Sequence, residues 1–187
     1  MLFSKGFFQL KFTILTQIFL IFSLIYPIDS NSHGPSRQKI KEKIIIDAEL
    51  SKVWNLVSDF SKFNWNEDIL KVSVEGNGIG SVRTLVFNND KQIQQSLEKL
   101  IDEKKIISWR IKKTEQTILP VNSYQATLIL KDLNGKTEVT YKAGFYRGFM
   151  GNDPPEELND VNSKKKAKEF VLKSLSGLKK IAEKWIL

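Results

Sequence analysis

The 187-residue sequence contains no cysteine and a single histidine, His33. A chain without cysteine forms no disulfide and offers neither a thiolate to a metal ion nor a thiol nucleophile. The lone histidine lies ahead of the part predicted to fold, so a Ser-His-Asp arrangement is excluded within the folded domain. As a new N-terminus, His33 could chelate copper, but such a site needs a second imidazole. We therefore predict no catalytic residue, no metal site and no cofactor.

Acidic side chains gather at two places, Glu67-Asp68 and the stretch 153–157. General acid catalysis needs a carboxyl group in a dry pocket, where its pKa is raised. Both groups fall in predicted surface loops, which favours solvated acids. The glycine-rich stretch 76–80 joins two predicted strands and opens no helix, so it fails the context test for dinucleotide binding. The chain is therefore predicted not to be an enzyme.

An uncharged apolar run spans residues 12–28, and the charged residues ahead of it are lysines. Ser30 and Ser32 follow with the spacing that signal peptidase requires. We predict a cleavable signal peptide over 1–32, export to the periplasm and no stable membrane anchor after cleavage. An uncleaved N-terminal anchor is the alternative, but the run is shorter than the roughly 20 apolar residues that span a bilayer.

Alternating apolar residues predict strands through most of the remaining chain. Residues 122–131 and 136–147 each carry apolar side chains at every second position, and Asn134-Gly135 between them is the strongest hairpin signal. An irregular leader is predicted over 33–38. The predicted strands are 39–46, 69–75, 81–87, 91–101, 104–113, 122–131 and 136–147.

Helical spacing of apolar residues occurs in residues 50–58, and a second short helix is predicted around 60–64. From about Glu157 the pattern is helical to the end of the chain. One apolar stripe runs along this last helix, formed by Val171, Leu175, Leu178, Ala182 and Trp185.

A single antiparallel sheet must bury one face, and the last helix is the only large apolar element available to cover it. We therefore predict an α+β helix-grip domain over 39–187. Its curved antiparallel sheet has about seven strands, with two short helices and one long C-terminal helix packed across it.

Several short motifs follow one another along roughly 39–185. They are Ile46-Asp47-Ala48, Val53 to Phe60, Trp65, Gly78 to Arg83, Asp102, Pro120, Tyr124 to Leu128, and Gly177-Leu178-Lys179. In order and spacing these motifs resemble those of the SRPBCC or START-like superfamily. This superfamily includes polyketide cyclases, lipid carriers and the birch-pollen allergen, and it has the helix-grip fold.

The resemblance implies that the space between sheet and helix holds a ligand cavity. Aromatic side chains with a few polar tips suit an apolar ligand. Relatives have arginine at the position of Arg83, which could meet the polar end of a ligand. The alternative is that these side chains simply fill the core. The candidate ligand-binding residues are Trp65, Arg83, Phe87, Trp109, Tyr124, Tyr141, Phe145 and Phe170.

The formal net charge is +8, and lysine outnumbers arginine. A basic surface suits an acidic protein partner, an anionic membrane or nucleic acid, although export argues against nucleic acid. A solvated lysine-rich surface is the alternative. Four lysines lie mostly off the stripe of the last helix and could form a partner-docking patch, since complementary charge raises association rates. They are Lys164, Lys165, Lys166 and Lys168.

The stretch His33 to Lys39, directly behind the predicted signal peptide, resembles the start of MxaD-type proteins. These are periplasmic accessory proteins of methylotrophs, encoded with methanol dehydrogenase, which help the dehydrogenase meet its c-type cytochrome. Relatives often carry a His-Pro pair after the tryptophan, whereas Asn66 and Glu67 follow Trp65 here, so no role of that histidine carries over.

The closer resemblance implies a non-enzymatic periplasmic accessory protein of methanol oxidation. Its partners would be methanol dehydrogenase, the c-type cytochrome, or both. The alternative is a carrier of a hydrophobic small molecule, and a cyclase or dehydratase is a third reading.

Overall fold

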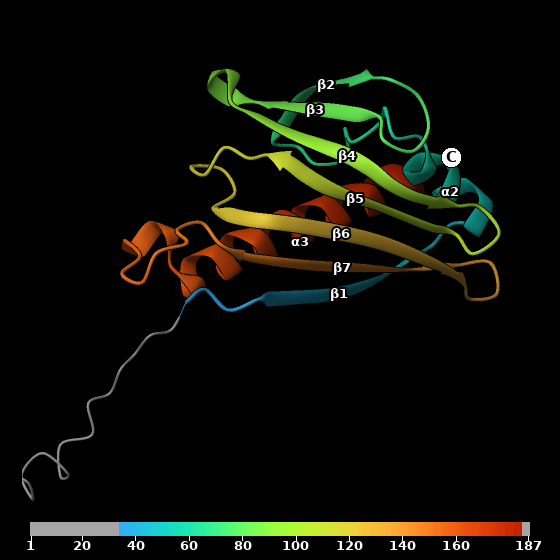
Figure 1. Ribbon diagram of the computed structural model, residues 1–187. Coiled ribbons are helices and arrows are strands. Elements are labelled where there is room, and N and C mark those ends of the chain that lie inside the picture. Colours follow the sequence, from blue (N-terminus) through green and yellow to red (C-terminus); the bar gives the residue numbers. More distant parts are fainter. Residues whose placement is uncertain (1–33, 185–187) are drawn as a thin grey trace, which may run out of the picture. The chain divides into compact units, whose positions relative to one another are not determined.

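Seven antiparallel strands form one sheet in the computed structural model, which describes residues 34–184. The strand order is β1-β7-β6-β5-β4-β3-β2, so β1 and β2 are the edges. Figure 1 shows the sheet in front of the long helix α3. The strands are β1 (Gln38–Ile46), β2 (Ile69–Glu75), β3 (Val82–Phe87), β4 (Gln92–Ile101), β5 (Ile106–Lys113), β6 (Val121–Asp132) and β7 (Thr137–Arg147).

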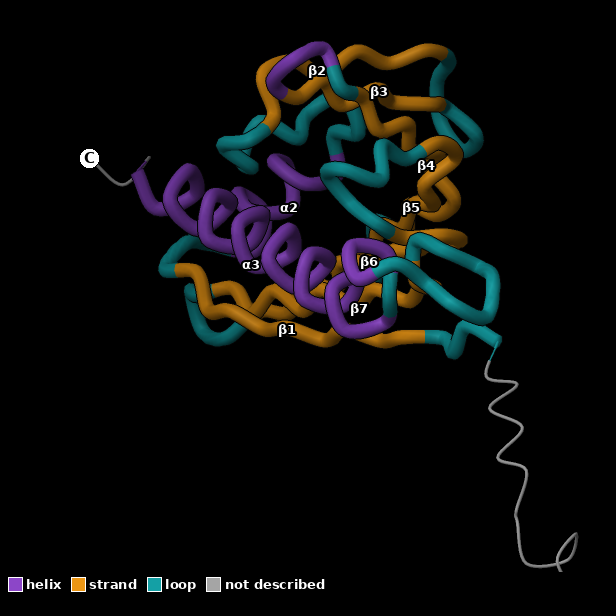
Figure 2. The backbone as a smooth tube through the Cα atoms, turned by 90° about the vertical axis from the view of Figure 1, so that its left-hand side faces the viewer, coloured by secondary structure: helices purple, strands orange, loops and turns teal. Residues whose placement is uncertain are grey.

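Two α-helices accompany the sheet within residues 34–184, α2 (Leu50–Ser58) and α3 (Asp160–Lys184). Figure 2 shows that the sheet curves around α3. The predicted stripe of α3 is buried at Val171, Leu175, Leu178 and Ala182, while Trp185 lies outside the described residues. The predicted helix-grip fold is confirmed. Short 3-10 turns at Asn88–Asp90 and Glu156–Leu158 complete the chain path.

The second short helix predicted around 60–64 is wrong, because this stretch forms turns. The Asp59 carboxylate accepts hydrogen bonds from the backbone N–H of Ser61 at 3.0 Å and from its hydroxyl at 2.5 Å. Such local side-chain bonds compete with helix formation. Residues 59–68 therefore run irregularly from α2 to β2, and we call them the cover segment.

The alternating pattern predicts correctly which strand residues face the core. The buried residues of β6 include Tyr124, Ala126, Leu128 and Leu130, and those of β7 include Val139, Tyr141, Ala143 and Phe145. The hairpin between these strands turns at Asn134 and Gly135, whose φ angles are 55° and 89°. Positive φ at both central positions is what a two-residue hairpin turn requires.

The N-terminal predictions fall mostly outside the described residues. The signal peptide over 1–32 and its alternative, an N-terminal anchor, both lie there, as does His33. Residues 34–37 are irregular as predicted, and β1 begins at Gln38, one residue earlier than expected. No helix within residues 34–184 combines the length and apolarity needed to cross a membrane.

Candidate functional site

Arg83 lies on β3, on the same inward face as Leu85 and Phe87. Its side chain is only 1% exposed. Gln95 on β4 is its direct cross-strand neighbour, and Arg83 Nε donates to Gln95 Oε1 at 2.8 Å. A guanidinium is thus held inside the domain by a neutral amide.

Three aromatic rings enclose this guanidinium. Its central carbon lies 4.2 Å from the ring centroid of Phe60, 4.3 Å from that of Phe63 and 4.9 Å from that of Trp109. Cation–π attraction at such distances is strongest where the cation is desolvated. The rings therefore compensate part of the cost of burying Arg83.

The remaining donors around Arg83 are poorly satisfied. Nη1 of Arg83 makes long contacts with the carbonyls of Phe60, at 3.5 Å, and Lys62, at 3.4 Å. Three buried nitrogens find no acceptor within residues 34–184: Arg83 Nη2, Gln95 Nε2 and Trp109 Nε1. A buried donor without an acceptor costs about 1–3 kcal/mol, and more if it is charged. We take this group of three donors as the candidate site.

The charge of Arg83 is not balanced by an acid of the described chain, since no carboxylate of residues 34–184 pairs with it. Burial lowers the pKa of Arg83 to about 9, and the electrostatic interaction with Tyr141 acts in the opposite direction. The guanidinium is therefore still protonated at neutral pH. A buried, unpaired cation of this kind favours an anionic or strongly electron-donating partner.

Two buried tyrosines border the site and stay neutral. The hydroxyls of Tyr124 and Tyr141 lie 3.0 Å apart in a hydrogen bond. Burial raises the pKa of Tyr124 well above its usual value and raises that of Tyr141 to about 12. Neither tyrosine therefore supplies a negative charge to Arg83 at neutral pH.

The cover segment closes the site on one side, with Phe63 at its centre. The Phe63 ring centroid lies 4.8 Å from that of Trp65, 5.9 Å from Trp109 and 6.2 Å from Phe170. A hollow of about 240 Å³ lies beside it, lined by residues 61–64 and 69–72. Displacement of the cover segment would therefore expose Arg83.

The cover segment is fastened to α3 at three points. Asn66 Nδ2 donates to Ser174 Oγ at 3.0 Å in a buried contact, and Lys173 pairs with Asp68 at 2.8 Å. At Gly177, an added Cβ would lie 1.6 Å from the carbonyl oxygen of Trp65. Glycine is thus required where α3 and the cover segment meet.

All eight predicted ligand-binding residues are buried. Ring and hydroxyl contacts link most of them. The ring centroids of Trp109 and Tyr141 lie 5.8 Å apart, and those of the stacked rings of Tyr124 and Phe145 also lie 5.8 Å apart. Phe87 is buried farther along β3 and makes no such ring contact among the described residues. The structure thus brings together Arg83, Trp109, Tyr141, Tyr124 and Phe145 of the predicted set.

Sequence reasoning missed Phe60, Phe63 and Gln95. The sequence pattern could have identified Gln95, because it lies between Ile93 and Leu97 at every second position of the strand and so falls on the inward face. The two phenylalanines lie in the stretch predicted as a helix, where no periodicity indicates which side chain turns inward.

The predicted docking lysines are all exposed on α3. Lys166 pairs with Glu169 at 3.5 Å and Lys168 with Glu42 at 3.2 Å. Lys164 and Lys165 make no hydrogen bond or ion pair within residues 34–184. The acids of the stretch 153–157 are exposed, as predicted, and no cluster of three potential metal ligands occurs in the described chain.

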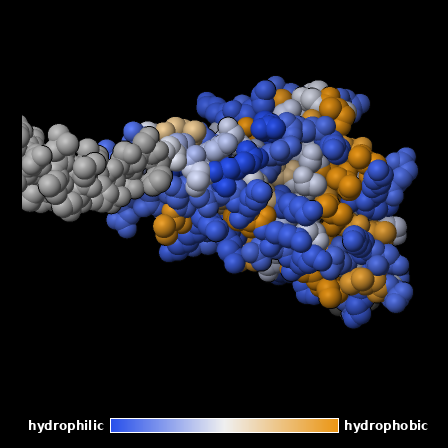
Figure 3. All heavy atoms as spheres, turned by 60° about the horizontal axis from the view of Figure 1, so that its bottom comes forward, coloured by the Kyte–Doolittle hydropathy of each residue, from blue (hydrophilic) through white to orange (hydrophobic). Residues whose placement is uncertain are grey.

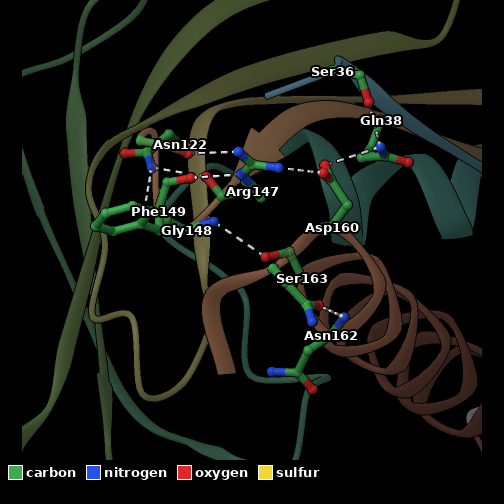
Figure 4. A network of polar contacts seen from close by, with 11 residues as sticks. Ser36, Gln38, Asn122, Arg147, Gly148, Phe149, Asp160, Asn162 and Ser163 are labelled. Atoms are coloured by element: carbon green, nitrogen blue, oxygen red, sulfur yellow. Dashed lines mark hydrogen bonds and ion pairs between the residues drawn. The ribbon is translucent and has the colours of Figure 1, made fainter. Parts of the chain in front are cut away.

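A second buried arginine, Arg147 at the end of β7, is fully satisfied. Its Nε donates to Phe149 O at 2.8 Å, Nη2 to Gly151 O at 2.6 Å, and Nη1 pairs with Asp160 at 2.7 Å. Figure 4 shows this network, in which Ser163 also accepts from the Gly148 N–H. Arg147 thus joins the loop after β7 to the start of α3.

The match to known proteins agrees with this architecture. The family described as polyketide cyclase / dehydrase and lipid transport matches residues 37–183. The chain belongs to this family, and the predicted superfamily is confirmed. No curated protein matches the chain.

Solved structures of distant proteins share the fold. XoxI of Bacillus cereus is 19% identical, with 76% of this chain and 94% of that one covered and a TM-score of 0.64. The ZhuI aromatase/cyclase of Streptomyces sp. R1128 is 15% identical, with 81% and 97% covered and a TM-score of 0.67. An uncharacterized protein of Bacillus thuringiensis is 18% identical, with 78% and 98% covered and a TM-score of 0.65.

Proposed function

We propose that the domain binds a hydrophobic small molecule whose polar end carries an oxygen acceptor, and that this end lies at Arg83. The observation that carries the proposal is the group of three unpartnered donors, Arg83 Nη2, Gln95 Nε2 and Trp109 Nε1. A carboxylate or another oxyanion would accept these hydrogen bonds and balance the guanidinium charge. Hydrogen bonds to charged groups contribute about 1.5–3 kcal/mol each.

The walls of the site favour an apolar or aromatic body behind that polar end. Rings of Phe60, Phe63 and Trp109 surround the guanidinium, and Tyr141 and Tyr124 continue from Trp109 toward Phe145. Aromatic rings offer large apolar area with defined stacking geometry. Since these side chains now touch one another, we propose that binding separates them and displaces the cover segment.

We propose that the domain binds this molecule without catalysing a reaction on it. The buried titratable side chains of residues 34–184 are Arg83, Tyr124, Tyr141 and Arg147. A carboxyl or imidazole that could remove a substrate proton is not among them, and the tyrosines are held neutral. Arg83 would orient a ligand and neutralise its charge.

Isothermal titration with two matched probes tests the proposal. We expect 2-naphthoate, an aromatic carboxylate, to bind at least about tenfold more tightly than 2-acetylnaphthalene, its neutral ketone counterpart. Arg83→Met should remove this difference, whereas the exposed-pair control Lys43→Met should retain it. Native mass spectrometry of freshly purified protein should reveal a retained ligand. The proposal is wrong if neither probe binds the unaltered protein.

A second candidate is the accessory role in methanol oxidation in the periplasm. It is supported by the likeness of His33 to Lys39 to the start of MxaD-type proteins and by the exposed lysines of α3. Sequencing of the mature N-terminus should find a start near His33. Pull-down from a methylotroph periplasm should recover methanol dehydrogenase or its cytochrome. Unchanged methanol oxidation after gene deletion would exclude this role.

A further inference from the structure

The outward face of β1 carries a row of lysines. Ile40 and Ile46 are buried toward α3, whereas the alternating residues Lys39, Lys41 and Lys43 are exposed on the opposite side. Successive outward positions of a strand are about 7 Å apart. The row is therefore a regular line of positive charge on the side of the sheet away from the helix.

The two neighbouring strands extend this row. Lys142 of β7 lies directly opposite Lys41, and Lys131 of β6 lies opposite Glu138 of β7. Both lysines are exposed. We call these five lysines, Lys39, Lys41, Lys43, Lys131 and Lys142, the lysine face. Figure 3 shows the molecule from the side where β1 lies and shows that hydrophilic residues cover most of it.

Arg37 adds a sixth positive charge beside the row. An added Cβ on Gly144 would lie 2.8 Å from Arg37 Nη2, so the guanidinium occupies the space that a side chain at this position of β7 would need. The same guanidinium is 5.7 Å from the ring centroid of Tyr146. The absence of a side chain at Gly144 thus lets Arg37 lie against the sheet.

Glu138 supplies negative charge on this face, and its pKa is lowered chiefly by the hydrogen bond from Lys43 and further by the charges of Lys43, Lys131 and Lys41. Lys43 pairs with Glu138 at 2.9 Å. Lys39, Lys41, Lys131 and Lys142 make no hydrogen bond or ion pair within residues 34–184. Like charges directly opposite one another in an antiparallel pair destabilise a sheet, and Lys41 and Lys142 stand in that relation. The face is therefore arranged at a cost to the isolated domain.

We propose that the lysine face docks an acidic protein surface in a short-lived complex. Lysine provides flexible, strongly hydrated point charges, which steer association more than they hold a partner. Because the strand spacing is fixed, the lysines lie at regular intervals, and carboxylates on a folded partner can be arranged at the same intervals. This surface is separate from Lys164 and Lys165 on α3, and docking there does not require a ligand at Arg83.

Other anionic partners fit the same face less well. Single-stranded nucleic acid binding relies on aromatic stacking platforms, and Tyr146 is the one aromatic residue at an outward position of β1, β6 and β7. Peripheral membrane binding combines charge with inserted apolar side chains. Ile45, which is 52% exposed, is the one large exposed apolar side chain at those positions.

Charge-neutralising variants test the inference with poly-L-glutamate as the probe. We expect Lys41→Gln/Lys142→Gln to weaken the binding of poly-L-glutamate about tenfold at low salt. Each lost lysine contact should lower the binding constant roughly threefold. The matched variant Lys164→Gln/Lys165→Gln removes the same charge from α3 and should weaken binding less than about twofold. Circular dichroism should show both variants folded.

Three outcomes would overturn the inference. Equal weakening by both variants would show that only net charge matters. A larger effect of Lys41→Gln/Lys142→Gln on phosphatidylglycerol vesicles than on poly-L-glutamate would assign the face to a membrane. A larger effect on a 20-base-pair DNA duplex would assign it to nucleic acid.

Discussion

Arg83 and Arg147 are both buried, but their surroundings differ in kind. Every side-chain nitrogen of Arg147 donates to a carbonyl or a carboxylate. Arg83 has one good hydrogen bond, to a neutral amide, and an Nη2 without an acceptor in the described chain. Burial alone therefore does not distinguish a structural arginine from a site arginine.

The difference shows how the cost of burying charge is met in each place. Around Arg147 the protein supplies the acceptors, so the guanidinium fixes the loop after β7 against α3. Around Arg83 the protein supplies aromatic rings and further donors instead. A region that leaves donors unsatisfied sacrifices stability, as binding sites do.

Removing Arg147 should have the largest effect on stability. In Arg147→Met, the carbonyls of Phe149 and Gly151 lose their donor and Asp160 keeps only the bond from Gln38. We expect the free energy of unfolding to fall by about 3 kcal/mol, as when one partner of a buried ion pair is removed. Urea denaturation measures it. Lys43→Met, which breaks an exposed pair, should cost less than about 1 kcal/mol.

Gly177→Ala should also destabilise the domain, although the same substitution in a helix ordinarily stabilises by roughly 1 kcal/mol. The new methyl group would collide with the Trp65 carbonyl and push the cover segment from α3. We expect a loss of about 2 kcal/mol, typical of overpacking. The exposed control Ser176→Ala should change stability by less than about 0.5 kcal/mol. A more stable Gly177→Ala protein would contradict the close approach.

Arg83→Met should separate stability from binding. Since the substitution removes an unpaired buried charge, we expect the free energy of unfolding to stay constant or rise by about 1 kcal/mol. Binding of 2-naphthoate should weaken at least about tenfold. The two measurements are urea denaturation and calorimetric titration. A stability loss as large as that of Arg147→Met would break the contrast between the two arginines.

The smallest effect concerns pH. Burial lowers the pKa of Arg83 to about 9, so the guanidinium is charged from pH 6 to pH 8 and loses its proton above about 9. We expect the affinity for 2-naphthoate to be constant between pH 6 and pH 8 and to fall above about pH 9, because unprotonated Arg83 attracts a carboxylate less. Arg83→Met should bind weakly without this fall. A decline between pH 6 and pH 8 would require another titrating group.

Burial of the charged form also fixes the sign of the stability effect. The pKa of Arg83 is lower in the folded domain than in the unfolded chain, which therefore binds more protons above about pH 9. The contribution of Arg83 to stability thus rises with pH in that range. Tyr141 acts in the opposite direction, because burial raises its pKa to about 12.

Local pattern predicted the fold well where one period governs a whole element. The inward residues of β6 and β7, the helix over 50–58 and the Asn134-Gly135 turn follow from alternation, helical spacing and positive φ. It failed over 60–64, where the Asp59 carboxylate stabilises turns through bonds that periodicity does not record.

The candidate site was predicted only in part, because Arg83 and Trp109 were named as site residues and Gln95 was not. The sequence indicates that Arg83 faces inward, yet its pairing with Gln95 depends on the register between β3 and β4. The missing acceptors depend on everything that surrounds the guanidinium, including Phe60 and Phe63 of the irregular cover segment. Such relations emerge only when distant segments are placed side by side.

The pairing of β1 with β7 has a consequence for how the domain is made. Gln38 pairs with Phe145, so the first strand of the sheet finds its partner only when the last strand has been synthesised. Contacts so far apart in sequence form late and slow folding. Until then β1 is a strand without a sheet, and lysines at every second position discourage it from pairing with other nascent chains. The charges that we assign to a partner in the finished domain thus also protect the unfinished one.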